Sequence, residues 1–122
     1  MPVIEVQALS RPTDLEVFLG DVCSAVANAL DASPGSVWCQ YRPMEPGCWY
    51  EGERVRGAGD AQSASPIVTI RAFEGRSPQQ KRDCLLAVAR SVGEGLRVDP
   101  QDVFVEYQEI RSGHVCTGGA VR

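Results

Sequence analysis

The residue with the clearest chemical potential in this 122-residue chain is Pro2, which lies directly behind Met1. Removal of Met1 would convert the Pro2 amide nitrogen into a secondary amine. Burial of that amine would lower its pKa, because desolvation disfavours the charged form. A second proline, Pro66, begins a similar β-rich run, but its nitrogen is locked in a peptide bond. The sequence therefore offers one candidate amine base, whose use depends on removal of Met1.

The other reactive side chains do not form a recognisable site. The five cysteines are odd in number and include no C-x-x-C pair, and His114 is the single histidine. This pattern argues against a disulfide framework or a zinc centre, so we expect no metal and reduced thiols in a cytoplasmic protein. His114 lies near the C-terminus between glycines, and we interpret it as structural.

Composition and charge exclude several classes of protein. The length fits one domain over residues 1–122, large enough to bury a core. A net charge of -4 gives no electrostatic reason to expect nucleic acid as a partner. No apolar run approaches the roughly 20 residues of a membrane span, and no signal pattern opens the chain. We therefore predict neither a nucleic-acid nor a membrane partner, and a cytoplasmic location.

An internal repeat defines the elements that must position Pro2. The pattern of each half predicts a strand, a helix, a strand and a short hairpin. The first half has strands at 3–9 and 37–41 around a helix at 14–30, and the second has strands at 67–73 and 103–110 around a helix at 78–95. The pseudo-repeats cover residues 2–52 and 66–119, and a polar, glycine-rich linker spans 53–65. Ser10 or Thr13 is expected to cap the first helix, and Ser77 the second.

Two strand–helix–strand units predict an α+β fold. Such connections are right-handed and make their strands parallel, so two units side by side give a four-stranded sheet with both helices on one face. The other face would carry Trp38, Phe104, Ile67 and Phe73, which are too apolar for permanent contact with water. We therefore predict a homo-oligomer whose sheets pack around a symmetry axis; the alternative is a monomer with a half-exposed sheet.

Three ordered motifs in the second half resemble the tautomerase superfamily. Residues 66–81 (PIVTIRAFEGRSPQQK) are similar to the opening of 4-oxalocrotonate tautomerase, residues 96–105 (LRVDPQDVFV) to its passage from helix into second strand, and residues 111–119 (RSGHVCTGG) to its C-terminal hairpin. The fused layout resembles cis-3-chloroacrylic acid dehalogenase, malonate semialdehyde decarboxylase and macrophage migration inhibitory factor. The resemblance implies a homotrimer of β-α-β-β-α-β protomers.

The resemblance also implies roles for individual residues. The family uses an N-terminal proline nitrogen for catalysis, so Pro2 is the expected general base, or general acid when protonated. Arg76, in the E-G-R turn, is expected to bind a substrate carboxylate through its planar guanidinium. Glu106 is a candidate second base or water-activating group, or else a solvated strand-end carboxylate. Candidate substrate-binding residues are Arg11, which is otherwise an exposed turn residue, and three aromatic residues that otherwise pack between subunits: Trp38, Phe104 and Trp49.

The sequence departs from the family at two places. Trp38 and Phe104 stand where the archetype has a strand arginine, and Trp49 and Val115 stand where it has a pocket phenylalanine. These departures argue against a substrate with two carboxylates. We predict cofactor-independent tautomerisation of a small 2-oxo or enol carboxylic acid. The alternatives are dehalogenation or decarboxylation on the same scaffold, and a non-catalytic trimer that has lost the activity.

Overall fold

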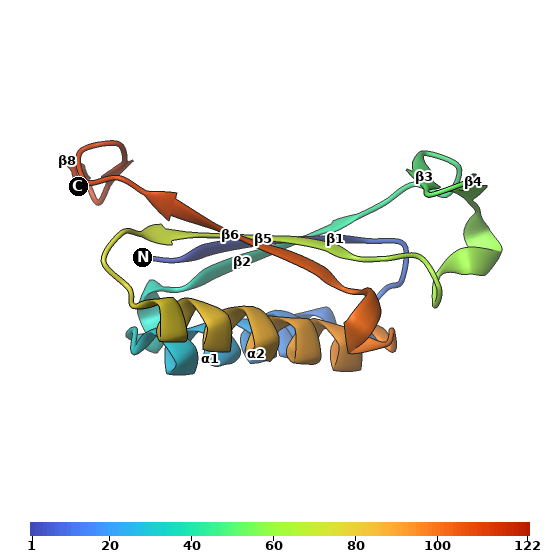
Figure 1. The fold of residues 1–122 in the computed structure, drawn as a ribbon, viewed down its shortest axis with the longest axis horizontal. Helices are drawn as coiled ribbons and strands as arrows, with labels where there is room; N and C mark the ends of the chain where they lie inside the picture. Colours follow the sequence, from blue (N-terminus) through green and yellow to red (C-terminus); the bar gives the residue numbers. More distant parts are fainter.

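A computed structural model describes all 122 residues, and its centre is a four-stranded sheet with two helices on one face (Figure 1). The strand order is β2-β1-β5-β6, and two small hairpins stand at the ends of the sheet. The elements are β1 (Val3–Ala8), α1 (Leu15–Leu30), β2 (Trp38–Pro43), β3 (Trp49–Glu51), β4 (Arg54–Arg56), β5 (Ile67–Phe73), α2 (Pro78–Leu96), β6 (Phe104–Ile110), β7 (Cys116–Thr117) and β8 (Ala120–Val121).

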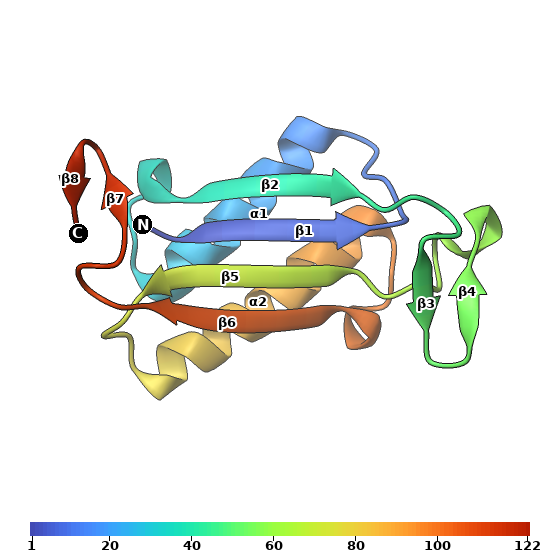
Figure 2. The same cartoon turned by 90° about the horizontal axis from the view of Figure 1, so that it is seen from above.

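The pairing of the strands places the two halves head to tail. β1 runs parallel to β2, β5 runs parallel to β6, and β1 pairs with β5 in the antiparallel direction. Pro2 and Pro66 therefore lie at opposite ends of the sheet (Figure 2). Each accepts a backbone hydrogen bond of 3.0 Å, Pro2 from the N–H of Trp38 and Pro66 from the N–H of Phe104. The predicted duplicated α+β fold is confirmed.

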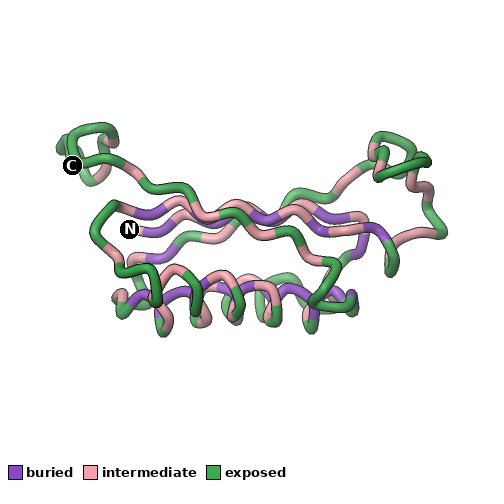
Figure 3. Tube along the Cα trace, viewed as in Figure 1, coloured by how far each residue is buried: buried purple, intermediate pink, exposed green.

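The core lies between the sheet and the helices, because each strand alternates inward and outward side chains. Inward positions of β1 and β5 are buried, whereas the neighbouring positions on the other face are only partly covered (Figure 3). Each fully buried aliphatic side chain contributes about 1.5–3 kcal/mol from the hydrophobic effect. Neither helix has the length and hydropathy that would let it cross a membrane. The fully buried core side chains include Ile4, Val6, Val22, Val26, Val68, Ile70, Val88 and Val92.

The cap of α1 differs from the prediction. Asp14 caps this helix, and its carboxylate accepts a hydrogen bond from the N–H of Val17 at 3.1 Å. The two residues expected to cap it instead bind the end of α2: the hydroxyl of Ser10 donates to the carbonyl of Leu96, and the hydroxyl of Thr13 accepts from Arg97. Both had suitable oxygens, but their oxygens bind groups that lie 84 or more residues away in the sequence.

The predicted cap of α2 is confirmed. The hydroxyl of Ser77 accepts from the N–H of Gln80 at 3.1 Å, and the Gln80 side chain accepts in return from the N–H of Ser77 at 3.0 Å. This reciprocal pair satisfies two of the free N–H groups at the start of the helix. It fixes the point at which the turn that carries Arg76 enters α2.

The predicted linker at residues 53–65 contains regular structure. It includes β4 and a short 3-10 turn at Ala58–Asp60, and an ion pair of 2.8 Å joins Arg54 to Asp60. β4 has only three residues, of sequence R-V-R, which is too short to show an alternating pattern. Its pairing partner β3 lies just before the segment, so the predicted boundary between residues 52 and 53 falls inside a hairpin.

The sheet face opposite the helices is apolar at its ends and charged near its middle. Trp38 and Phe104 are 54% and 56% exposed, as expected for an uncovered face. Between them, Glu5 forms ion pairs with Arg42 at 3.3 Å and with Arg71 at 3.4 Å. The open face therefore also carries charged residues, besides the apolar ones that the sequence places there. Both hairpins rise on this side, away from the helices (Figure 1).

Candidate active site

The amino terminus, the end of β5 and the C-terminal hairpin meet at one end of the sheet (Figure 2). Pro2 is fully buried there, at the start of β1. The turn that follows β5 carries Arg76. The C-terminal hairpin contacts the first residue, since the hydroxyl of Thr117 donates to the Met1 sulfur at 3.8 Å. Segments from the two extremes of the chain therefore form one site.

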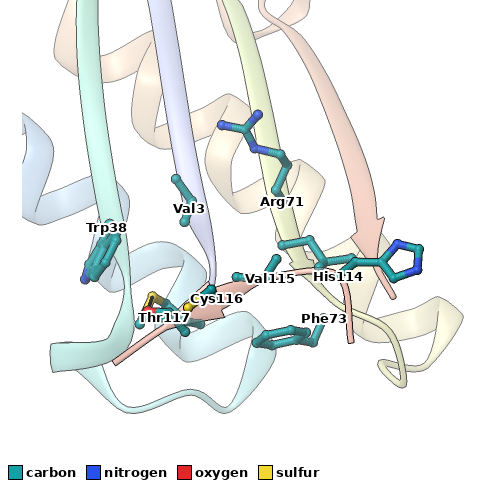
Figure 4. A pocket seen from close by; sticks show the side chains of 10 residues that line it. Val3, Trp38, Arg71, Phe73, His114, Val115, Cys116 and Thr117 are labelled. Atoms are coloured by element: carbon teal, nitrogen blue, oxygen red, sulfur yellow. Dashed lines mark hydrogen bonds between the residues drawn. The ribbon is translucent and has the colours of Figure 1, made fainter. Parts of the chain in front are cut away.

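A pocket of about 460 Å³ opens at this end of the sheet (Figure 4). Its wall is mainly apolar and comes from four strands and the hairpin. The imidazole of His114 stands at the rim and points away from the other lining side chains (Figure 4). The lining residue with a permanent charge is Arg71 on β5. The apolar wall consists of Met1, Val3, Trp38, Phe73, Ile110, Val115 and Cys116.

The electrostatics of the site favour a neutral amine at the amino terminus. Burial lowers the pKa of the terminal amino group, and the positive charge of Arg76 lowers it further. Both causes disfavour the ammonium form, which must lose water and approach a like charge. In this structure the amine belongs to Met1, and the Pro2 nitrogen is the next one inward. Removal of Met1 would place the amine at a fully buried residue.

The predicted site residues of one chain lie at the two opposite ends of its sheet. Trp38 lines the pocket, whereas Pro2 and Arg76 lie at the same end of the sheet but are not among the lining residues. The predicted roles of all three remain predictions. The antiparallel pairing of β1 with β5 places Phe104 at the other end, and Trp49 lies there too because it follows β2, which runs parallel to β1. Arg11 also lies at that far end, because it follows β1.

Glu106 lies on the open face near the middle of β6, in register with Thr69 of β5. Its carboxylate is exposed and accepts a hydrogen bond of 3.2 Å from the side chain of Gln108. It shares a face with Phe104, as its spacing predicted, but it does not line the pocket of its own chain. Its predicted role as a second base or water-activating group stays a prediction.

The end of the sheet that carries Pro66 has no comparable pocket, because the preceding segment fills it. Ala64 is only 2% exposed. The carboxylate of Glu51 accepts hydrogen bonds from the N–H of Ser65 at 2.8 Å, from its hydroxyl at 3.1 Å and from the indole of Trp49 at 3.0 Å. Arg56 completes this set with an ion pair of 3.2 Å. Of the two ends of the sheet that begin with a proline, the Pro2 end therefore carries the open pocket.

Sequence reasoning missed part of the pocket wall. Four lining residues were not among the predicted site residues: Arg71, Ile110, Cys116 and Thr117. A signal existed for Arg71, because it alternates with Ile67 and Phe73 and so lies on the open face. The hairpin residues gave no such signal, since two-residue strands carry no periodicity.

Two comparisons of the sequence with known proteins agree on the family. A family model described as "Tautomerase enzyme" matches residues 66–121. A probable tautomerase of Halalkalibacterium halodurans is 37% identical over 54 residues, which cover 44% of this chain and 88% of that protein. The chain belongs to the tautomerase family. The predicted resemblance is confirmed, and the matched half is the one whose turn and hairpin border the pocket.

The fold of the family extends over nearly the whole chain. The structure of native fused 4-OT (the abbreviation of 4-oxalocrotonate tautomerase) has a TM-score of 0.83, with 98% of this chain and 94% of that chain covered at 20% identity. A member of the cis-3-chloroacrylic acid dehalogenase family gives 0.75 over 98% and 82% at 22% identity. Macrophage migration inhibitory factor from Trichinella spiralis gives 0.77 over 98% and 99% at 14% identity. These likenesses show a fused tautomerase fold.

Proposed function

We propose that this chain is a cofactor-independent tautomerase that acts on a small 2-oxo or enol carboxylic acid, with Pro2 as its general base. The observation that carries the proposal is the position of the amino terminus. It lies at an apolar pocket, and burial together with Arg76 lowers the pKa of its amine. That amine belongs to Met1 in the structure; after removal of Met1 the Pro2 nitrogen would take its place, and the same causes would favour its unprotonated, basic form.

The proposed reaction moves one proton. The Pro2 nitrogen accepts the proton of the enol hydroxyl, so the O–H bond breaks and the C2=O bond forms. The resulting ammonium returns a proton to C3, which yields the ketone and the free amine. Arg76 would bind the substrate carboxylate and stabilise the negative charge on the C2 oxygen, because a guanidinium offers several N–H donors in one plane. No atom is added or lost.

We also propose that the active form is a homotrimer. Two solved structures of fused 4-OT are described as wild-type trimers, one asymmetric and one symmetric. The large exposed side chains Trp38 and Phe104 at the ends of the open face support burial against other subunits. In such an assembly Phe104, Trp49 and Arg11 would reach a Pro2 pocket from a neighbouring subunit. Their predicted role in substrate binding depends on this contact.

Keto–enol transfer is favoured over hydrolytic dehalogenation, the nearest alternative on this scaffold. Dehalogenation needs a carboxylate that activates water beside the substrate. Glu106, the candidate for that role, lies outside the pocket of its own chain, so dehalogenation would also need this carboxylate to reach the substrate from a neighbouring subunit. Proton transfer between oxygen and carbon needs only the amine and a group that stabilises the enolate charge.

Ketonisation of phenylenolpyruvate, followed by absorbance, tests the proposal. Protein from which Met1 has been removed, as shown by N-terminal sequencing, should be active. Pro2→Ala should lose about 10²-fold or more of kcat/KM, the range expected when a general base is lost. Wild-type protein that retains Met1 is the matched control, because it keeps every side chain but has no basic nitrogen at Pro2. Equal rates in all three, or no rate in any, would refute the mechanism and leave a non-catalytic scaffold as the better account.

A further inference from the structure

Met1 lines the pocket, although the proposed reaction requires its removal. Its carbonyl carbon is bonded to the nitrogen of Pro2, so it lies directly beside the proposed base. The positive charge of Arg76 acts on its amino group, and its thioether sulfur accepts a hydrogen bond of 3.8 Å from the hydroxyl of Thr117. Met1 therefore marks the space that a ligand would take in the processed chain, next to Pro2 and within reach of Thr117.

The C-terminal hairpin fixes the position of Thr117. This residue ends β7, and a two-residue turn through Gly118 and Gly119 joins it to its pairing partner Ala120 on β8. The two glycines have φ angles of +63° and +78°, as the central residues of a type I′ turn require. Thr117 is half-buried and lies on the same side of the pocket as Trp38 (Figure 4). Its hydroxyl is thus carried by a backbone of defined conformation.

Thr117 supplies the one hydroxyl group among the side chains that line the pocket. Its partner in the structure, the Met1 sulfur, is a weak hydrogen-bond acceptor, whereas a ketone or hydroxyl oxygen is a better one. Removal of Met1 takes this acceptor away and leaves an uncharged donor in a mainly apolar wall. A polar group in such a place costs free energy unless it is paired, so an oxygen atom of the ligand is its natural partner.

We propose that Thr117 is a catalytic residue whose hydroxyl donates a hydrogen bond to the C2 oxygen of the substrate, in the place that the Met1 sulfur holds in the unprocessed chain. The inference rests on the proposed function, in which this oxygen gives its proton to Pro2. The hydroxyl proton stays on Thr117, and the hydrogen bond strengthens as negative charge develops on the oxygen. Thr117 also selects acids with an oxygen on C2, because an acid without it leaves the hydroxyl unpaired.

A binding experiment tests this assignment without requiring catalysis. Two non-reacting monocarboxylates that differ only in an oxygen on C2 are titrated calorimetrically into protein that lacks Met1: 2-hydroxy-3-phenylpropanoate, each enantiomer separately, and 3-phenylpropanoate. Wild type should bind one enantiomer of the hydroxy acid about 3- to 10-fold more tightly, the effect of one hydrogen bond. Thr117→Val removes the hydroxyl but keeps the shape of the side chain, and it should abolish this preference. Thr117→Ser keeps the hydroxyl and should retain the preference.

Two controls separate the hydroxyl from its surroundings. Thr69→Val makes the same chemical change on the open face of β5, outside the pocket, and should leave the preference within about twofold of the wild-type value. Wild-type protein that retains Met1 should bind both probes at least about 10-fold more weakly, because Met1 fills part of the space and the ligand loses apolar contacts.

The same variants give a kinetic test. Thr117→Val should lower kcat for ketonisation of phenylenolpyruvate by about 10-fold or more, because a donor to the developing charge is lost. Thr117→Ser should keep most of the activity. The rising limb of the pH–rate profile should stay at the wild-type pH in both variants, because neither removes a charge near the amine.

Three results would overturn the assignment: no preference for the hydroxy acid in wild type, a preference that survives in Thr117→Val, or undiminished binding of both probes to protein that retains Met1. The ketonisation assay is read separately. A protein that shows the preference but does not ketonise phenylenolpyruvate would contradict the proposed reaction and retain Thr117 as a determinant of ligand specificity. A protein that ketonises phenylenolpyruvate but binds both probes equally would contradict only the role of Thr117.

Discussion

Replacing Glu51 by Gln should loosen the segment that fills the Pro66 end of the sheet. In the folded chain the Glu51 side chain is 26% exposed and accepts hydrogen bonds from Ser65, Trp49 and Arg56 at 2.8–3.2 Å. Gln keeps an acceptor at one oxygen, but the amide that replaces the other oxygen faces the Arg56 guanidinium with a donor. The variant should therefore lose the ion pair and weaken the contacts with Ser65.

The size of the effect follows from the number of charged contacts. A hydrogen bond to a charged group contributes about 1.5–3 kcal/mol to stability, and an exposed pair contributes less. Because Gln retains part of the set, we expect the free energy of unfolding to fall by about 1–3 kcal/mol at pH 7. Hydrogen exchange at the Ser65 amide should become faster, because its acceptor is no longer charged.

The stabilising contribution of Glu51 should depend on pH. Burial alone would raise the pKa of Glu51, but hydrogen bonds from Ser65 and Trp49 and the charge of Arg56 bring it below its ordinary value of 4.5. A carboxylate with a lowered pKa stabilises the fold above its unfolded pKa, and this contribution is lost as the pH falls through the folded pKa. The stability difference between wild type and Glu51→Gln should therefore shrink as the pH falls below 4.5.

Urea denaturation at a series of pH values measures this difference. Glu53→Gln is the matched control, because Glu53 is exposed in the same hairpin and makes no side-chain hydrogen bond or ion pair. It should change stability by less than about 0.5 kcal/mol. An equal loss in both variants, or a Glu51→Gln deficit that stays constant down to low pH, would refute the reasoning.

Three further substitutions test the site and its support. Arg76→Ala should lower kcat/KM about 10- to 100-fold through loss of a charged hydrogen bond. The rising limb of the pH–rate profile should also move to higher pH, because the amine loses a nearby positive charge. A rising limb at the wild-type pH would contradict this. Ser10→Ala should cost about 1–3 kcal/mol, since the buried carbonyl of Leu96 loses its donor, and an unchanged urea midpoint would refute that. Gly95→Ala should also destabilise, by about 1–3 kcal/mol, because its new Cβ would lie 2.8 Å from Phe18 Cε1; a gain in stability would show that helix propensity outweighs the clash.

The fold could be predicted because two independent patterns point the same way. Helical spacing and strand alternation recur in both halves, so each half supports the interpretation of the other. Strand parity also explains why two tyrosines lie on the helix side of the sheet. Tyr41 packs edge-on against Phe18 and donates its hydroxyl proton to the carbonyl of Ser10 at 2.6 Å. Tyr107 packs against the buried core.

The candidate site could be predicted only in part, for a reason that the repeat itself creates. Sequence alignment of the halves treats Trp38 and Phe104 as equivalents, although the antiparallel pairing of β1 with β5 places them at opposite ends. Arg71 was missed because a single arginine in a strand usually faces solvent. Its place in a pocket depends on the C-terminal hairpin, which folds back to the start of β1 through contacts that no local pattern encodes.

The same geometry explains why the two proline ends of the duplicated sheet differ. Each end of the sheet has a proline, a strand that begins beside it, and a hairpin from the other half of the chain. At one end the proline lies next to the chain terminus, where removal of one residue frees its nitrogen. At the other end the peptide bond to Ser65 makes the nitrogen non-basic, and Glu51 holds that residue in place. The first-half hairpin thus packs against the segment before Pro66 in its own chain, whereas the second-half hairpin lines the pocket at the Pro2 end.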